Sequence, residues 1–266
     1  MKRLAEAFAR GKVLVAYLCV GDPTVDESVE LAVACAKAGA DVLELGVPFS
    51  DPTADGPAIA RASQRAIAKG GGLEATLRAA KAVRAAAPGV GVVVFGYYNP
   101  IFVRGEERVA REAAEAGVDA LLIVDLPVEE SGSLRAAGRA HGVGVVPLLA
   151  PTSSAERVAA VKAAAREGGT PFVYYVSVTG VTGAAAVDAK DAGARAGKLR
   201  ADLGLPVVVG FGIDGRDKAR AAAAEVDGAV VGTALVRLVE TGASPAERRS
   251  AVEGLVRELR AGVDAS

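Results

Sequence analysis

Short apolar runs rich in β-branched residues alternate along the whole chain with alanine-rich segments of amphipathic helical pattern. This alternation is typical of a parallel sheet whose strands are joined by helices. About eight such units in a chain of 266 residues predict closure into a (β/α)8 TIM barrel, an α/β fold. No linker or shift in composition divides residues 1–266, so one barrel domain is expected. The predicted strands begin near Val13, Asp41, Gly91, Val118, Val143, Pro171, Pro206 and Gly228.

The connection after the second predicted strand is longer than the others. It contains a Pro/Asp/Gly-rich loop over residues 48–57, a helix expected over residues 57–69, three glycines and a second helix expected over residues 73–87. We therefore predict an extra helix after strand two, beside a long loop at the C-terminal rim, where barrels place their active sites. An open doubly wound sheet is the alternative. The first strand–helix turn, residues 20–24, lacks the G-x-G-x-x-G fingerprint of that fold.

A lone carboxylate, Glu44, interrupts the apolar run of the second strand near its C-terminal end. Side chains of a strand alternate between two faces, which places Glu44 on the face of Val42 and Gly46. Burial disfavours the charged form and raises a carboxyl pKa towards neutrality, where the group can donate or accept a proton. A structural carboxylate held by backbone amides is the alternative, but this end of a barrel strand favours a catalytic role. Asp51 and Asp55 follow in a loop where aspartate is also a common turn residue.

Glycine-bearing turns follow the seventh and eighth predicted strands, at residues 209–214 and 230–234. Barrels frequently bind a phosphate there, through backbone N–H groups and the N-terminus of a short helix. A simple tight turn is the alternative. The small residues over 179–186, after strand six, fit a mobile lid or a flexible connection equally well.

The charge pattern argues against nucleic-acid and membrane partners. Basic and acidic residues number 31 and 32, and no Lys/Arg cluster is interleaved with aromatic residues. No apolar stretch reaches about 18 residues. Charged residues interrupt the first ten positions, which excludes a signal-peptide core, so a cytoplasmic protein is expected.

The side-chain inventory argues against several kinds of catalytic site. The single histidine, His141, falls in a segment expected to be a solvated loop, so neither a catalytic triad nor a zinc site is predicted. Cys19 and Cys35 fall on a predicted strand and a predicted helix, as reduced packing residues do. Strands two to eight carry no lysine, which disfavours a Schiff-base aldolase, so carbon–carbon cleavage would need a substrate with its own electron sink. A carboxylate magnesium site involving Asp125 stays open.

The stretch LELGVPFSDPTADGP, residues 43–57, closely resembles the signature of the tryptophan synthase alpha chain family. Further pieces agree in order along the chain: GDP at 21–23, YYNP at 97–100, VDLPVEE at 124–130, SVTGVTG at 177–183, GFGI at 210–213 and GTA at 232–234. The resemblance implies a lyase of tryptophan biosynthesis that cleaves indole-3-glycerol phosphate to indole and glyceraldehyde 3-phosphate, with no cofactor in this chain. It also implies a pyridoxal-phosphate-containing beta chain as partner, in an alpha2-beta2 tetramer.

The same resemblance assigns roles to individual residues. Glu44 corresponds to the catalytic proton-transferring glutamate and Asp55 to the catalytic aspartate near the indole nitrogen. The substrate-binding positions correspond to Tyr17 in the indole pocket, Tyr174, and Thr182 on the lid. The phosphate-binding positions correspond to Gly183, Gly212, Gly232 and Thr233. Asp51 and Pro52 resemble the contact region for the beta chain.

Three other functions remain as alternatives. The chain could be a free-standing indole-3-glycerol-phosphate lyase, or a mainly allosteric activating subunit with weak catalysis, although intact Glu44 and Asp55 argue against the latter. A metal-dependent phosphosugar epimerase is disfavoured by the single histidine. Protonation of indole C3 by Glu44 would turn the ring into an electron sink, which agrees with the missing lysine.

Overall fold

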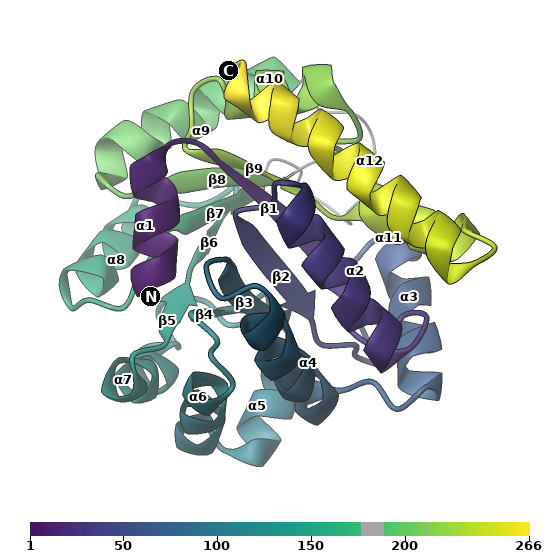
Figure 1. The fold of residues 1–266 in the computed structure, drawn as a ribbon. Coiled ribbons are helices and arrows are strands. Elements are labelled where there is room, and N and C mark those ends of the chain that lie inside the picture. Colours follow the sequence, from purple (N-terminus) through teal and green to yellow (C-terminus); the bar gives the residue numbers. More distant parts are fainter. Residues whose placement is uncertain (177–188, 211) are drawn as a thin grey trace.

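The computed structural model describes residues 1–176, 189–210 and 212–266 and shows a closed barrel of parallel strands (Figure 1). The strands are β1 (Val13–Cys19), β2 (Val42–Gly46), β3 (Gly91–Gly96), β4 (Ala120–Ile123), β5 (Gly144–Val146), β6 (Leu148–Leu149), β7 (Val173–Val176), β8 (Val207–Gly210) and β9 (Gly228–Val231). Their order in the sheet is β5-β4-β3-β2-β1-β9-β8-β7-β6. The predicted (β/α)8 architecture is confirmed.

The fifth predicted strand, residues 143–148, is observed as the two pieces β5 and β6. Pro147 separates them, and because proline has no N–H it cannot continue a ladder of hydrogen bonds. β5 pairs with β4, whereas β6 pairs with β7. The two ends of the sheet are therefore joined through Pro147, and this junction closes the barrel.

The helices surround the sheet (Figure 1). They are α1 (Lys2–Arg10), α2 (Val25–Ala38), α3 (Pro57–Ala68), α4 (Leu73–Ala86), α5 (Tyr98–Arg104), α6 (Glu106–Glu115), α7 (Gly132–His141), α8 (Ala155–Arg166), α9 (Ala189–Leu203), α10 (Arg216–Ala223), α11 (Thr233–Thr241) and α12 (Pro245–Asp264). The extra helix predicted after strand two is α3, which begins at Pro57, a favoured first helical residue. The C-terminal helix α12 lies along α2, where Arg248 donates a hydrogen bond to Glu27 at 2.9 Å.

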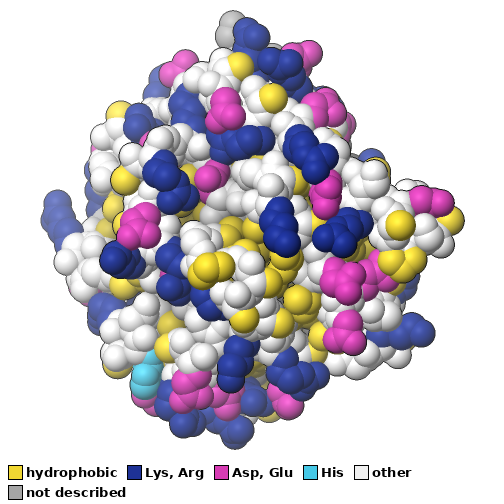
Figure 2. All heavy atoms as spheres, viewed as in Figure 1, with side chains coloured by type: hydrophobic (Ala, Val, Ile, Leu, Met, Phe, Trp, Pro, Cys, Tyr) yellow, Lys and Arg dark blue, Asp and Glu magenta, His cyan; other side chains and the backbone are white. Residues whose placement is uncertain are grey.

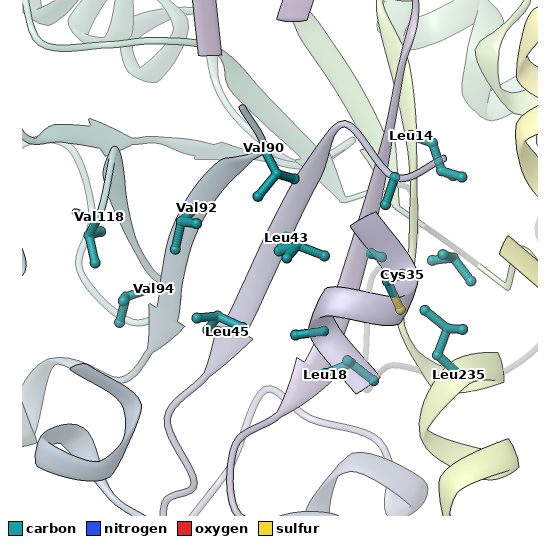
Figure 3. Close-up of a cluster of buried hydrophobic side chains, with 14 of the residues drawn as sticks. Leu14, Leu18, Cys35, Leu43, Leu45, Val90, Val92, Val94, Val118 and Leu235 are labelled. Carbon is teal, nitrogen blue, oxygen red and sulfur yellow. The ribbon is translucent and has the colours of Figure 1, made fainter. Parts of the chain in front are cut away.

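Two apolar layers hold the barrel together. One lies between the strands and the surrounding helices and includes Leu43 and Leu45 of β2 and Cys35 of α2 (Figure 3). The other fills the barrel interior and includes Val42 of β2. The predicted alternation along β2 is thus confirmed, and it places Glu44 on the interior face with Val42.

Helix α1 closes the N-terminal end of the barrel. Its Leu4 is fully buried in the interior layer, and a Cβ at Gly91 would approach Leu4 Cδ2 to 2.6 Å. Phe8 packs its ring against Phe172, with centroids 5.5 Å apart. This end of the barrel is packed with apolar side chains, so polar chemistry is left to the opposite end.

His141 differs from its prediction. It is the last residue of α7 rather than a loop residue, and its Nε2 atom lies 2.6 Å from Glu107 Oε1. The helix ends there because Gly142 follows in the left-handed conformation, with φ 74° and ψ 20°. Figure 2 shows acidic and basic side chains interspersed over one face of the molecule. In the part of the chain that the structure describes, no helix is both long and apolar enough to cross a membrane.

Candidate active site

The C-terminal ends of the strands bring the predicted acid–base residue together with two tyrosines. Glu44 of β2 pairs in register with Tyr17 of β1 and with Val93 of β3. Tyr174 comes from β7, and burial raises its pKa, with the charges of Glu44 and Asp55 adding to the effect. The alternating strand pattern therefore directs Tyr17, Glu44 and Tyr174 towards the barrel interior, near the rim that carries the Asp55 loop.

Glu44 is held in an apolar setting that keeps it protonated. It is only 1% exposed, and its Oε1 atom is buried without a hydrogen-bond partner in the described part of the chain. Burial raises the pKa of Glu44 to about 8. No described backbone amide donates a hydrogen bond to Oε1, so this oxygen gives no support to the alternative of a structural carboxylate. A neutral carboxylic acid near pH 7 is suited to donate a proton.

Asp55 lies in a more polar setting than Glu44. Burial raises its pKa to about 6, and a hydrogen bond from Tyr97 acts in the opposite direction. The Tyr97 hydroxyl lies 2.9 Å from Asp55 Oδ2 and accepts the Ala54 N–H at 3.0 Å. At neutral pH, Asp55 is therefore mostly ionised while Glu44 is mostly protonated. Environments that separate two carboxyl pKa values in this way are typical of an acid–base pair.

Tyr97 is a residue whose role the sequence reasoning missed. Its YYNP segment was recognised as part of the family resemblance, but no function was attached to it. Its ring stacks on Phe49 with centroids 5.1 Å apart. In the sequence, the only indication of a role for Tyr97 is that two adjacent tyrosines directly follow a predicted strand, at the C-terminal rim of the barrel.

Two glycines make room for the site tyrosines. A Cβ at Gly46 would come within 2.4 Å of the Tyr17 hydroxyl, and a Cβ at Gly210 within 2.0 Å of the Tyr174 hydroxyl. Burial raises the pKa of both tyrosines well above the ordinary phenol value, with the charges of Asp55 and Glu44 adding to the effect. Both are therefore neutral phenols, whose rings can pack against an aromatic substrate.

The turns predicted to bind phosphate lie after adjacent strands, since β8 pairs with β9. Gly212 follows β8 with a φ of 39°, which glycine adopts readily. Gly232 follows β9 and precedes Thr233, the first residue of α11, and no described side chain caps this helix start. Its first N–H groups have no partner within the helix and can receive an anion. The predicted residues Thr182 and Gly183 lie outside the described residues.

The predicted partner-contact residues lie on the loop that carries Asp55. Asp51 is exposed and Pro52 is half-exposed. The neighbouring helix α5 exposes two large apolar side chains, Phe102 at 66% and Val103 at 78%. Because Tyr97, just before α5, bonds to Ala54 and Asp55, the loop and the start of α5 are adjacent.

No trio of His, Cys, Asp or Glu side chains that could hold a metal ion occurs among the described residues. Asp125, the candidate magnesium ligand, instead accepts the Tyr98 N–H at 2.7 Å and so caps the start of α5. Cys19 and Cys35 are buried free thiols, as predicted, and burial raises the pKa of each to about 12.

Comparison with known families identifies the chain. The family model for the tryptophan synthase alpha chain matches residues 4–264. The chain belongs to the tryptophan synthase alpha chain family. The known activity of this family is the carbon–carbon lyase reaction that cleaves indole-3-glycerol phosphate in tryptophan biosynthesis, and membership implies a beta-chain partner.

Individual relatives agree with the assignment to the tryptophan synthase alpha chain family. The tryptophan synthase alpha chain of Citrifermentans bemidjiense is 46% identical over 268 residues, which cover 99% of this chain and 98% of the relative. That of Burkholderia pseudomallei is 45% identical over 269 residues, with 99% and 97% covered. Tryptophan synthase subunit alpha from Legionella pneumophila superposes with a TM-score of 0.89 at 33% identity over 100% of both chains. A chain of Mycobacterium tuberculosis tryptophan synthase gives 0.86 at 36% identity, with 98% of each covered.

Proposed function

We propose that this chain cleaves indole-3-glycerol phosphate with Glu44 as the proton donor and shuttle and Asp55 as the group that stabilises the indole N–H. The observation that carries this assignment is the difference between the two carboxyl environments. Burial raises the pKa of Glu44 to about 8, whereas that of Asp55, beside the Tyr97 hydroxyl, is about 6. One neutral acid and one carboxylate are therefore available at the same pH.

The proposed reaction runs through a cationic indole ring. Glu44 gives its proton to indole C3, and the positive charge spreads to the ring nitrogen, whose N–H bonds to the Asp55 carboxylate. Glu44, now ionised, takes the proton of the hydroxyl on the carbon attached to C3. That carbon becomes the aldehyde of glyceraldehyde 3-phosphate as its bond to C3 breaks, and the electron pair restores neutral indole. The ring itself is the electron sink, so no lysine is required.

Other residues at the C-terminal rim are proposed to bind the substrate. Tyr17 and Tyr174 are proposed to line the indole site together with Thr182, and the phosphate is proposed to bind the backbone N–H groups of Gly183, Gly212, Gly232 and Thr233. The uncapped start of α11 supports the second assignment, because helix N-termini favour anions.

The partner is proposed to be a tryptophan synthase beta chain that holds pyridoxal phosphate and consumes the indole, in an alpha2-beta2 tetramer. This chain is proposed to act as one domain over residues 1–266, in the cytoplasm and without a cofactor of its own. The exposed Asp51 and half-exposed Pro52, on the loop that Tyr97 ties to the start of α5, and the exposed Phe102 and Val103 of α5 support a contact at this rim.

Indole release from indole-3-glycerol phosphate tests the proposal directly. The purified chain is assayed alone and with increasing amounts of a tryptophan synthase beta chain. Slow release that the beta chain accelerates strongly supports a lyase that works in a complex. Fast release that the beta chain leaves unchanged would instead support the free-standing lyase. Absence of release in both assays would overturn the enzymatic assignment.

A further inference from the structure

Tyr97 holds the loop over residues 47–56 through two different parts of its side chain. It is 4% exposed and lies between β3 and α5. The face of its ring stacks on Phe49 at an interplanar angle of 26°. Its hydroxyl reaches the far side of the loop, 3.0 Å from the Ala54 nitrogen and 2.9 Å from Asp55 Oδ2. The loop that carries Asp55 is thus fixed to the end of β3.

The direction of the hydrogen bond to Asp55 follows from the proton inventory. A tyrosine hydroxyl has one hydrogen, and a backbone amide can only donate. Since the hydroxyl oxygen accepts the Ala54 N–H, its own hydrogen points to Asp55 Oδ2. A hydrogen bond donated to a carboxylate stabilises the ionised form. This bond engages Oδ2, so Tyr97 does not occupy the other carboxylate oxygen, Oδ1.

The surroundings of Asp55 make this bond important. The charge of Asp55 contributes to the raised pKa of Tyr17 and Cys19 on β1, of Tyr174 on β7, and of Tyr97 between β3 and α5. Glu44 raises the pKa of Tyr17 and Tyr174, and Asp125 raises that of Tyr97. Burial opposes ionisation of Asp55, and the Tyr97 bond is the favourable contribution.

We propose that Tyr97 is a positioning residue for the lyase reaction: its hydroxyl holds the Asp55 carboxylate ionised and oriented so that Oδ1 meets the indole N–H. The inference rests on the role proposed above for Asp55. Tyr97 itself does not touch the reacting atoms. Its effect on the reaction passes through Asp55.

Tyr97→Phe removes the hydroxyl and keeps the ring that stacks on Phe49. We expect the Asp55 pKa to rise by about one pH unit, the scale of a lost hydrogen bond to a charged group. The acid limb of the pH profile of kcat/KM for indole release then shifts to higher pH by the same amount. The resulting loss is roughly tenfold below about pH 6 and much smaller near pH 8. Thermal unfolding followed by circular dichroism checks that the variant folds.

Tyr98→Phe is the matched control. The Tyr98 hydroxyl donates a hydrogen bond to Glu106 Oε1 at 2.9 Å. Tyr98→Phe therefore also removes one tyrosine hydroxyl, from the adjacent residue, but leaves the hydrogen bond to Asp55 intact. Its acid limb should coincide with that of the wild type. In an Asp55→Asn background, Tyr97→Phe should cause little further loss, because residues that act through one another are not additive.

A substrate-free measurement separates this proposal from the proposed function. Carbon-13 NMR of aspartate-labelled protein follows the Asp55 carboxyl, assigned by its absence in Asp55→Asn, across a pH titration. A higher Asp55 pKa in Tyr97→Phe supports the proposal. An unchanged pKa, or a loss of kcat/KM that is equal at all pH values, would overturn it and leave Tyr97 as a packing residue. Absence of indole release from the wild type would overturn the proposed function, whatever the NMR titration shows.

Discussion

At the scale of single residues, the site depends on two carboxyl groups that respond differently to burial. Glu44 lies among interior apolar side chains and has an unpartnered oxygen in the described part of the chain, whereas Asp55 receives a hydroxyl hydrogen bond. The desolvation of Glu44 therefore goes uncompensated and that of Asp55 is partly compensated. The site thereby contains a proton donor and an anion at one pH.

The first prediction concerns the pH dependence of kcat/KM. Activity requires ionised Asp55 and protonated Glu44, so it should rise through about pH 6 and fall through about pH 8. Burial, rather than a charge interaction between the two carboxyl groups, raises both pKa values, so the acid limb reports Asp55 and the alkaline limb reports Glu44. Glu44→Gln should lower turnover by at least about 10²-fold and remove the alkaline limb. Steady-state indole release across pH measures both effects, and near-normal turnover of this variant would exclude Glu44 as the acid.

The second prediction concerns the glycine beneath Tyr17. Gly46→Ala would place a methyl group within 2.4 Å of the Tyr17 hydroxyl, so the ring must move from its position. We expect kcat/KM to fall by roughly tenfold or more, while overpacking costs about 1–3 kcal/mol of stability. Gly89→Ala is the control, because its new Cβ meets nothing within 4 Å. Equal kinetics for both variants would contradict the proposed role of Tyr17 in lining the indole site.

Part of this site could be predicted from single positions. The alternation of side chains along a strand was sufficient to place Glu44 on the interior face, and its pKa direction followed from burial. The Tyr97–Asp55 bond could not be predicted, because it joins residues 42 positions apart and depends on how β3 and the loop after β2 pack together. The roles of Thr182 and Gly183 stay predictions that rest on resemblance.

At the scale of elements, the hydrophobic pattern of the sequence predicted the strands better than it predicted the breaks within them. Strand β3 begins and ends at the predicted residues 91 and 96, because an apolar run ends there at glycine on both sides. The break at Pro147 was missed because a run of apolar residues was given more weight than the missing N–H. The short helix α5, Tyr98–Arg104, was also missed, since it is only seven residues long. A helix of under two turns has little periodicity to detect.

The third prediction concerns the attachment of the extra helix α3. Arg65 of α3 donates two hydrogen bonds, of 2.9 and 2.8 Å, to Asp22, which is 4% exposed, and a third to Glu240 of α11. Arg65→Gln would leave the buried Asp22 without its ion-pair partner and should reduce the free energy of unfolding by about 2–4 kcal/mol. Urea denaturation measures this loss.

Arg61→Gln serves as its control. Arg61 is half exposed and pairs only with Glu240 in the described structure, so its removal should cost less than about 1 kcal/mol. Equal midpoints for the two variants would show that Arg65 and Asp22 contribute no more than a surface ion pair. Because α3 also contributes Ile59 and Ala62 to the apolar cluster around Tyr17, Arg65→Gln should weaken substrate binding as well.

At the scale of the whole molecule, barrel closure separates a packing end from a chemical end. Helix α1 and the interior apolar layer fill the N-terminal end, so the carboxylates and the glycine turns meet at the other. The alternation of strands and helices was sufficient to predict this polarity, because parallel strands bring all their C-terminal ends to one rim. The partner surface could be predicted only from the family resemblance, because the sequence alone does not show which apolar residues are exposed in the folded chain.

The last prediction concerns that surface. Phe102 is 66% exposed on α5, next to the loop that carries Asp51, so Phe102→Ser should leave indole release by the isolated chain nearly unchanged. If the beta chain covers this residue, the concentration of beta chain needed for half-maximal stimulation should rise by about tenfold or more, as for a large apolar contact. Ile67→Ser on α3, at 41% exposure, controls for the loss of an exposed apolar side chain. Titration of indole release with beta chain measures the shift, and coincident curves for wild type and Phe102→Ser would place the beta-chain contact elsewhere on the rim.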